Sequence, residues 1–440
     1  MTDLSASNSS SLLTEDKHTK KRNAAEKRFR AYGLGAIILA CAMLVVLLVS
    51  IVSNGASSFK QTYISFPVTI SQEEFDAAEG SILKTGAYNK MLQSALLSYL
   101  TTNDLLGEAT EDDASGLVSG EAAADVRRLL LANADVIGTE IDFTILANGR
   151  IDGYFKGRVT RETAAVDSKI TGAQLDLADR MTEHGAMITK FNWRFFTNPD
   201  ASVQRPEAAG LGVAILGSLY MMAVVLCLAL PIGVAASIYL EEFAKKSWIT
   251  DVIEVNIANL AAVPSIVYGI LGLAIFINFA ELHQSSPLVG GLVLTLMTLP
   301  TIIISTRASL KSIPPSIRDA ALGVGASKMQ SVFHHVLPLA APGILTGTII
   351  GLAQALGETA PLLLIGMVAF VKEYPAAYSS ELGLFGEAST ALPVQIFNWT
   401  TRSDPAFVER ASGAIITLLI FLLIMNAFAI FLRKKFERRW

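Results

Sequence analysis

Long apolar blocks limit what this chain can fold into more than any other feature of its sequence. The first block, residues 33–53, contains no charged residue and is long enough for a helix that crosses a bilayer, which needs about 20 residues. A segment inside lipid has to satisfy its own backbone hydrogen bonds, so we expect a helix. Five further blocks follow at 211–239, 256–280, 288–306, 339–369 and 412–432. The pattern therefore predicts an all-α transmembrane fold with six spans.

The composition and the start of the chain agree with this prediction. Only 17% of the residues are charged, whereas soluble proteins carry about 25%. Residues 1–32 are polar and end in a basic run, and the apolar block after them is longer than that of a cleavable signal peptide. We therefore expect residues 33–53 to remain as a membrane anchor. Cys41 and Cys227 lie in apolar blocks, where we expect buried packing residues and neither a disulfide nor a metal site.

The distribution of lysine and arginine predicts which side of the membrane each segment faces. Seven of these residues precede the first span, and the segments 241–255, 307–337 and 433–440 hold two, four and five. The segments 281–287 and 372–410 hold none and three. Because cytoplasmic loops carry the excess of positive charge, both termini are predicted to be cytoplasmic. The long polar segment 54–209 then lies outside, and residues 210–432 form the main transmembrane domain.

Residues 54–209 are predicted to form a folded extracytoplasmic domain of mixed, mostly helical structure. Helical patterns occur at 87–100, 121–133 and 173–190. A β-prone stretch, 140–155, contains Asn148-Gly149, which is a strong signal for a hairpin turn. The segment has 22 acidic and 14 basic residues and therefore a formal charge of −8. Such an acidic domain is poorly suited to capturing an anion by itself.

Motifs of catalytic or nucleotide-binding sites are missing from the sequence. The stretch 323–328, GVGASK, is rich in glycine but lacks the spacing of a P-loop. His334 and His335 are adjacent, so on a helix their side chains point about 100° apart. No other histidine or cysteine is near them in the sequence. We expect neither a metal site nor enzymatic chemistry on this chain.

The cytoplasmic segment 307–337 has the features of a short helix. Pro314-Pro315 suits the first turn of a helix, and Asp319 is expected within that turn, where the helix dipole favours an acid. Small residues are predicted to line one side of it: Ala320, Ala321 and Gly325. Pro338 is predicted to end the helix before the next span. Such a helix is either a docking point for another protein or a tolerated loop.

Residues 319–338, DAALGVGASKMQSVFHHVLP, resemble the EAA loop of ABC importer permeases, whose pattern is E-A-A-x3-G-x9-I-x-L-P. Asp319 replaces the usual glutamate, and His335 replaces the usual isoleucine. Four further stretches are similar to phosphate-importer permeases of the PstA type: 259–273, 305–314, 355–370 and 391–399. Residues 17–200 resemble an extra N-terminal region that some of these permeases carry.

The resemblance implies a permease subunit in an ATP-driven phosphate importer of the cell inner membrane. A related permease would form the other half of the pore, and an ABC ATPase dimer would dock from the cytoplasm. That ATPase would bind ATP and Mg²⁺, so no cofactor is expected on this chain. A periplasmic phosphate-binding protein would deliver the phosphate, and membrane lipid but no nucleic acid is implied as a further partner. The residues implied to couple to the ATPase are Arg318, Asp319, Ala320, Ala321, Gly325, Leu337 and Pro338.

Two other functions stay open. An importer of another oxyanion, such as phosphonate, sulfate or molybdate, would share these motifs. A membrane receptor would use residues 54–209 as a sensor. It is expected to carry a cytoplasmic signalling module after a span, whereas residues 433–440 form only a short basic tail.

The fifth predicted span contains a ridge of small residues. Gly343, Gly347 and Gly351 recur at every fourth position. This small-xxx-small pattern lets a neighbouring membrane helix approach closely. We therefore predict a helix-packing face there.

The same span contains candidates for the translocation path. Gln354 and Glu358 are four residues apart and are expected to share one face of the helix. An ionisable residue in a membrane span is a functional candidate by default. Thr359 and Arg307 complete the candidate path. A structural role stays open for Glu358 next to Pro361, and a role as a positively charged anchor stays open for Arg307.

Overall fold

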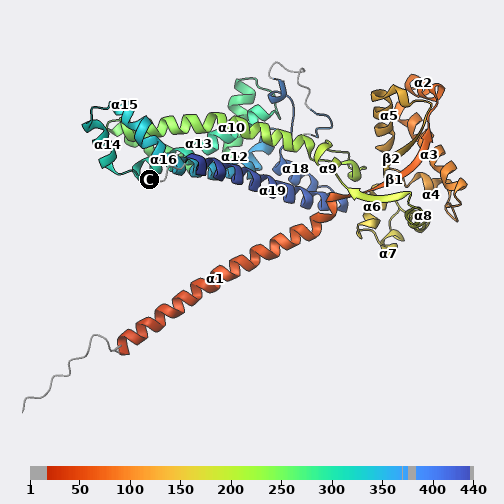
Figure 1. Cartoon of the computed structure of the whole chain (residues 1–440), viewed down its shortest axis with the longest axis horizontal. Coiled ribbons are helices and arrows are strands. Elements are labelled where there is room, and N and C mark those ends of the chain that lie inside the picture. Colours follow the sequence, from red (N-terminus) through yellow and green to blue (C-terminus); the bar gives the residue numbers. More distant parts are fainter. Residues whose placement is uncertain (1–16, 369, 375–382, 437–440) are drawn as a thin grey trace, which may run out of the picture. The chain divides into compact units, whose positions relative to one another are not determined.

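The computed structural model of the chain describes residues 17–368, 370–374 and 383–436. It forms two compact units, residues 1–53 and 54–440. Helix α1 (Lys17–Gly55) includes every described residue of the first unit and contains the block predicted as the first span (Figure 1). The second unit contains the other apolar helices and a mixed α+β domain.

Among the described residues, five helical segments are long and apolar enough to cross a membrane, and a bent pair makes a sixth if it forms one span. Besides α1 they are α10 (Gly212–Ile238) with the π turn η4 (Tyr239–Phe243), α13 (Pro287–Lys311), α16 (Leu337–Gly357) and α19 (Pro405–Phe436). The structure thus confirms the predicted all-α membrane fold.

Helix α13 packs between α10 and α16, and α19 packs against α16 and α18 (Leu392–Thr400). Glycine allows the close contact of α10 and α13. A Cβ atom added to Gly291 of α13 would lie 2.5 Å from Val224 Cβ of α10.

The block 256–280 is not one straight helix, contrary to the prediction. Helix α11 (Trp248–Ala261) and helix α12 (Ser265–Gly272), which continues as the π turn η5 (Leu273–Phe279), are bent by 101°. Pro264 explains the break, because a proline disfavours helical backbone at the residue before it. The Tyr268 hydroxyl donates a 2.7 Å hydrogen bond to the Leu260 carbonyl and so fixes the bend.

The block 339–369 is also interrupted. Helix α16 ends at Gly357, and helix α17 (Ala360–Leu364) begins two residues after Glu358. Pro361 has no N–H to bond the Gly357 carbonyl four residues earlier, so the α-helical ladder cannot continue. The helix therefore ends at Gly357, 12 residues before residue 369, where the predicted span ends.

Residues 56–209 form a mixed domain, here called the inserted domain, which confirms the predicted α+β class. Its antiparallel sheet has the order β2-β1-β3, with β1 (Lys60–Thr69), β2 (Glu140–Leu146) and β3 (Met187–Phe191). Its helices are α2 (Gln72–Gly80), α3 (Lys84–Thr102), α4 (Glu111–Ser115), α5 (Ala122–Ala132), α6 (Gly149–Phe155), α7 (Arg161–Ala164), α8 (Gly172–Glu183) and α9 (Arg194–Thr197). Short 3₁₀ turns are η1 (Ala56–Phe59), η2 (Ala134–Val136) and η3 (Pro206–Ala208).

The core of the inserted domain lies between the sheet and α3. Alternate residues of β1 point inward, because strand side chains alternate between faces. These are Ile64, Phe66 and Val68. One side of α3 meets them with residues four apart: Tyr88, Leu92, Leu96 and Leu100. Both periodicities are visible in the sequence and account for the two-layer arrangement.

The predicted hairpin at Asn148-Gly149 is wrong. The Asn148 side chain instead caps α6 by accepting a 2.9 Å hydrogen bond from the Arg150 N–H. An asparagine side chain serves as a helix N-cap as well as it serves in a turn. An added Cβ at Gly149 would lie 2.6 Å from Glu207 Oε2, so a larger residue there would require the Glu207 carboxylate to shift.

The two cysteines are not buried, contrary to the prediction. Cys41 of α1 and Cys227 of α10 are both free and exposed. An apolar position in a membrane helix need not be covered by the same chain, because lipid or a partner also covers apolar surface. Apolar sequence alone therefore did not predict burial.

Candidate functional site

The 307–337 loop connects α13 to α16 and folds as helix α14 (Pro315–Gly323) followed by helix α15 (Lys328–Ser331). Apolar side chains anchor it to the end of the helix bundle. Ile317 of α14 packs on a buried group formed by Ile238, Leu310, Ile313, Val332, Val336, Ala340 and Ile344. One side of the loop is thus fixed to α10, α13 and α16.

Arg318 fastens α14 to the end of α10. Its Nη2 atom lies 2.6 Å from Glu242 Oε1, and its Nε atom lies 3.1 and 3.2 Å from the two carboxylate oxygens. It also donates hydrogen bonds to the Ile313 carbonyl at 2.9 Å and the Leu310 carbonyl at 3.0 Å. The Glu242 side chain is 6% exposed and that of Arg318 is 22% exposed. The Arg318 guanidinium therefore holds the loop to the end of α10 by contacts within the same chain.

The other side of α14 is open. Asp319 and Ala320 are exposed, and beside them Leu322 is 47% and Val324 is 86% exposed. Ala321 is buried on the inner side, so the prediction that it shares a small side with Ala320 is wrong. Neighbours on a helix point about 100° apart. Asp319 stands in the second turn and not in the first, because the helix begins four residues earlier.

Gly325 ends α14 through its backbone conformation. Its φ of +88° lies in a region that glycine adopts without strain. The Ala326 N–H donates to the Ala321 carbonyl at 3.1 Å and the Gly325 N–H to the Leu322 carbonyl at 3.0 Å, the two bonds of a Schellman motif. No described atom comes within 4 Å of an added Cβ at this position. Glycine is needed here for the turn, whereas the sequence had suggested a role in keeping one side small.

Pro338 does not end a helix, contrary to the prediction. Helical backbone runs from Lys328 to Gly357. The π turn η6 (Val332–Val336) lies directly before Leu337 and Pro338. A proline crowds the carbonyl four residues earlier in an α-helix, and a π turn widens the helix at that point. Leu337 and Pro338 thus lie inside a continuous helix, at the start of α16.

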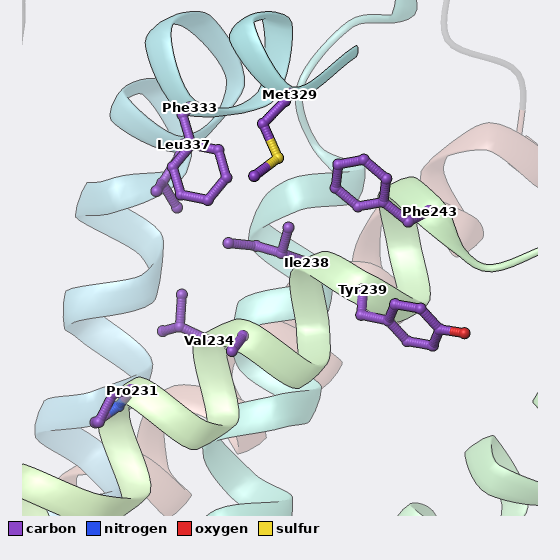
Figure 2. Close-up of a pocket in the computed structure, with 9 residues that line it drawn as sticks. Pro231, Val234, Ile238, Tyr239, Phe243, Met329, Phe333 and Leu337 are labelled. Atoms are coloured by element: carbon purple, nitrogen blue, oxygen red, sulfur yellow. The ribbon is translucent and has the colours of Figure 1, made fainter.

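An apolar groove of about 460 Å³ lies between the end of α10 and the helix from Lys328. Figure 2 shows Met329, Phe333 and Leu337 from that helix facing Ile238 and Phe243 from α10 and η4. Met329 is 60% and Phe333 is 45% exposed. The groove therefore adds exposed apolar surface next to the open side of α14.

Arg307 forms ion pairs at the end of α13. Its Nη2 atom lies 2.6 Å from Glu254 Oε1 of α11, and its Nε atom lies 3.5 Å from Glu241 Oε2 of η4. Its side chain is 14% exposed. The structure thus places Arg307 with α11 and η4, away from the other candidates for the translocation path.

The prediction that Gln354 and Glu358 share one face of a helix is wrong. Gln354 lies in the last turn of α16 and is exposed. Glu358 follows the end of α16 in extended backbone, with φ −76° and ψ 130°, and is half-buried. Thr359 precedes the first residue of α17. The break described above is the reason, because the four-residue spacing relates side chains only within a continuous helix.

The glycine ridge of α16 lies against α13. An added Cβ would lie 2.4 Å from Ser309 Oγ at Gly343 and 2.0 Å from Ser305 Oγ at Gly347. At Gly351 the nearest atom, Ile302 Cγ1, would be 3.5 Å away. Two of the three glycines therefore sit where no side chain fits without a shift of the neighbouring helix.

Sequence reasoning missed the acidic partners of these arginines. Glu241, Glu242 and Glu254 bind Arg307 and Arg318. A signal was available, because Glu241-Glu242 stands at the cytoplasmic end predicted for the second span, where lysine and arginine are usual. Two adjacent acidic residues at such a position indicate that basic side chains lie nearby.

Comparisons with known proteins match this part of the chain. A family model described as the binding-protein-dependent transport system inner membrane component matches residues 229–440, and one described as a domain of unknown function (DUF3333) matches residues 16–165. The probable ABC transporter permease protein YqgI of Bacillus subtilis is 30% identical over 248 residues, which cover 54% of this chain and 82% of the relative. The phosphate transport system permease protein PstA of Mycobacterium leprae is 31% identical over 256 residues, which cover 57% of this chain and 79% of the relative.

Among solved structures, a chain of an inward-facing MetNI methionine ABC transporter aligns with 52% of this chain and 95% of its own length, at 14% identity and a TM-score of 0.40. The sequence relatives, at 30–31% identity, are matched over most of their own length. The family model's match, residues 229–440, includes the 307–337 loop and helices α13, α16 and α19, and the chain is a multi-pass membrane protein. It belongs to the ABC transporter permeases of the binding-protein-dependent kind, and among these to the PstA type.

Proposed function

We propose that this chain is a permease subunit of an ATP-driven importer of inorganic phosphate. The relative from Mycobacterium leprae is named for phosphate transport. In this function the chain performs no chemistry, and a partner ATPase binds ATP and Mg²⁺. Hydrolysis there switches the pore between outward and inward access.

The observation that carries the proposal is helix α14. It is held to α10 by Arg318 and Glu242, while Asp319 and Ala320 on its other side remain open. To pass the motion of an ATPase subunit to the pore, a helix needs both a rigid attachment to the membrane helices and a free surface for that subunit. The neighbouring exposed residues Leu322 and Val324 supply apolar contact area, which is the main source of binding free energy at such a surface.

The proposed topology follows from the positive-inside distribution of charge. Residues 1–32, the 307–337 loop and residues 433–440 face the cytoplasm, where their lysines and arginines are favoured. Residues 33–53 form the first span, 54–209 the extracytoplasmic domain and 210–432 the permease domain. The protein then lies in the cell inner membrane with both termini in the cytoplasm.

We further infer a heterodimeric pore with a related permease and a periplasmic phosphate-binding protein on the outer side. The exposed Gln354 and the half-buried Glu358 lie at the end of α16, where polar groups are costly in lipid. A partner permease that covers them would place them, with Thr359, along the path. The ion pairs of Arg307 favour its alternative role as an anchor of α13.

Uptake by a reconstituted complex tests the proposal. The chain is co-expressed with its partner permease, ATPase and binding protein, and radiolabelled phosphate uptake is measured in proteoliposomes with internal ATP. Competition with sulfate, molybdate and phosphonate identifies the oxyanion. We expect phosphate alone to compete, and inhibition of uptake by another oxyanion at lower concentration would assign the chain to that solute.

Two variants of Asp319 test the coupling surface. Asp319→Lys reverses the charge on the open side of α14 and is expected to abolish uptake while the complex still hydrolyses ATP. Asp319→Glu restores the residue usual in the family and is the matched control, with uptake near that of the wild type. Unchanged uptake by Asp319→Lys would remove α14 from the coupling mechanism.

A further inference from the structure

A cluster of buried charges joins the inserted domain to the first turns of α19, and the proposed function does not use it. Its members are Asp152, Lys156 and Arg158 from α6 and the residues after it, Glu207 from η3, and Glu409 and Arg410 from α19. Three are acidic and three are basic, so their formal charges cancel. We call it the α6–α19 cluster.

Glu409 of α19 contacts three residues of the inserted domain, Arg158, Lys156 and Ser58. Its carboxylate forms an ion pair with Arg158 and lies 3.3 Å from Lys156 Nζ. The Glu409 carbonyl also accepts a 2.9 Å hydrogen bond from Ser58 Oγ. The Glu409 side chain is only 9% exposed, so these contacts are shielded from water.

Asp152 ties the same cluster to the central strand of the sheet. It lies 2.6 Å from Lys156 Nζ and accepts a 2.9 Å hydrogen bond from the Thr62 N–H of β1. The side chains of Asp152 and Lys156 are 3% and 4% exposed. Burial lowers the pKa of Lys156 to about 8. A lysine side chain buried in this way stays charged only when groups of opposite charge lie next to it.

Arg410 connects α19 to the segment that leads into α10. It donates hydrogen bonds to the Ala209 carbonyl at 2.6 Å, the Glu207 carbonyl at 2.8 Å and Gln61 Oε1 at 3.1 Å. The residue is 3% exposed. Glu207 in turn accepts a 2.5 Å hydrogen bond from Ser119 Oγ. One arginine thus links α19, β1 and the end of the inserted domain.

A second contact next to the cluster holds α18 to the inserted domain. Asp200 accepts a 2.9 Å hydrogen bond from Trp399 Nε1 and forms an ion pair with Arg402. Trp399 is fully buried, and the Arg402 guanidinium lies 4.4 Å from the centre of the Phe407 ring. The domain is therefore attached over both α18 and the start of α19.

We propose that the α6–α19 cluster makes the inserted domain and the outer ends of α18 and α19 one rigid body, which moves as a unit during the transport cycle. Ion pairs without access to water hold only in one geometry, because a separated buried charge is strongly disfavoured. A domain that was merely tethered would not need six balanced charges at its contact. The part of the proposal that concerns the cycle rests on the proposed function, whereas the rigid attachment does not.

Distances between spin labels in the full assembled complex test the proposal. The labels are placed at Val166 in the inserted domain and Val408 on α19, which are 88% and 51% exposed, after Cys41 and Cys227 are replaced by serine. We expect one narrow distance in the wild type, unchanged when ATP is added. Glu409→Gln, which leaves Arg158 and Lys156 without their shared carboxylate, should broaden that distance.

Further variants separate the cluster from general damage. Asp176→Asn is the matched control, because it removes one carboxylate of an exposed pair with Arg161, whose side chains are 51% and 55% exposed. Its distance should remain narrow. Arg158→Gln should also broaden the distance. The double variant should broaden it no further than Glu409→Gln alone, since Glu409→Gln already removes the ion pair with Arg158. Arg158→Gln also replaces Glu409→Gln if the latter does not fold.

Each outcome decides a stated part of the proposal. A narrow distance in both Glu409→Gln and Arg158→Gln would show that the cluster does not hold the domain. A wild-type distance that shifts on addition of ATP would show that the domain and α19 move separately. The measurements without ATP stand whatever solute the complex carries, so failure of the phosphate proposal leaves the rigid attachment open to test.

Discussion

The brace between Arg318 and Glu242 is the part of the mechanism that a single substitution tests most sharply. Glu242→Gln keeps the size of the side chain but removes the charge that binds the guanidinium. Arg318 then keeps its hydrogen bonds to the Ile313 and Leu310 carbonyls but loses its ion pair. Helix α14 loses its main polar attachment to the end of α10.

The size of the effect follows from burial. Loss of one partner of a buried ion pair costs about 3–5 kcal/mol, because the other charge remains buried. Arg318 is 22% exposed and keeps its two carbonyl partners, so we expect the lower end, about 3 kcal/mol. A change of about 1.4 kcal/mol corresponds to a factor of ten in an equilibrium constant. The population in which α14 is detached should therefore rise about a hundredfold.

Hydrogen exchange of the backbone amides in α14 measures this population directly. The matched control is Glu241→Gln at the adjacent position, whose contacts to Arg307 and Lys311 are longer, at 3.5 and 3.6 Å. It should change exchange in α14 by less than about tenfold, as expected for a weak ion pair. In the assembled complex, Glu242→Gln should also lower the phosphate imported per ATP hydrolysed.

Equal exchange rates in Glu242→Gln and the wild type would refute this reasoning. The apolar contacts of Ile317, with the hydrogen bonds from Arg318 to the Ile313 and Leu310 carbonyls, would then be enough to hold the loop. Faster exchange with unchanged transport per ATP would show that rigid attachment of α14 is not needed for coupling.

Two other predictions concern packing and pH. Gly347→Ala should lower the thermal unfolding temperature in detergent, with an overpacking cost of about 1–3 kcal/mol, because its Cβ would lie 2.0 Å from Ser305 Oγ. Gly351→Ala should change this temperature little, because its Cβ would lie 3.5 Å from the nearest atom, Ile302 Cγ1. Equal losses would contradict that contact. Hydrogen bonds from Arg127, Lys84 and Tyr88 lower the pKa of Glu79 to about 2, so its stabilisation of the inserted domain is complete above pH 4.5 and is lost as the pH falls towards 2. Pepsin should therefore cleave the wild-type domain faster as the pH falls through that window, whereas the Glu79→Gln domain should be cleaved readily already at pH 4.5. A difference in cleavage rate between wild type and Glu79→Gln that does not change with pH would contradict this prediction.

The sequence predicted the elements that depend on local pattern. The apolar blocks, the start of α14 at the two prolines and the α+β class of the inserted domain follow from periodicity and composition. The breaks at Pro264 and Pro361 were within reach of the same reasoning, because each proline interrupts an otherwise helical pattern. Apolar composition alone predicts a straight helix over 256–280, which is bent, and a span over 339–369, whose first helix ends at Gly357.

The roles of individual site residues depend on contacts that local pattern does not contain. Arg318 and Glu242 are 76 positions apart, and Arg158 and Glu409 are 251 positions apart. Only the packing of α10 against α13, and of the inserted domain against α19, brings these pairs together. The role of Gly325 is likewise not visible in the sequence. The pattern predicts that it keeps one side of the helix small, whereas its φ of +88° is what requires glycine.

A photo-cross-linking amino acid at Ala320 tests the central claim, that an ATPase grips the open side of α14. The control carries the same amino acid at Ala321, which is buried on the inner side of the helix. The tagged complex is irradiated in membranes, and the attached protein is identified by mass spectrometry. We predict a nucleotide-hydrolysing subunit attached at position 320 and none at 321. Cross-links from position 320 that reach only lipid or extracytoplasmic protein would contradict the account.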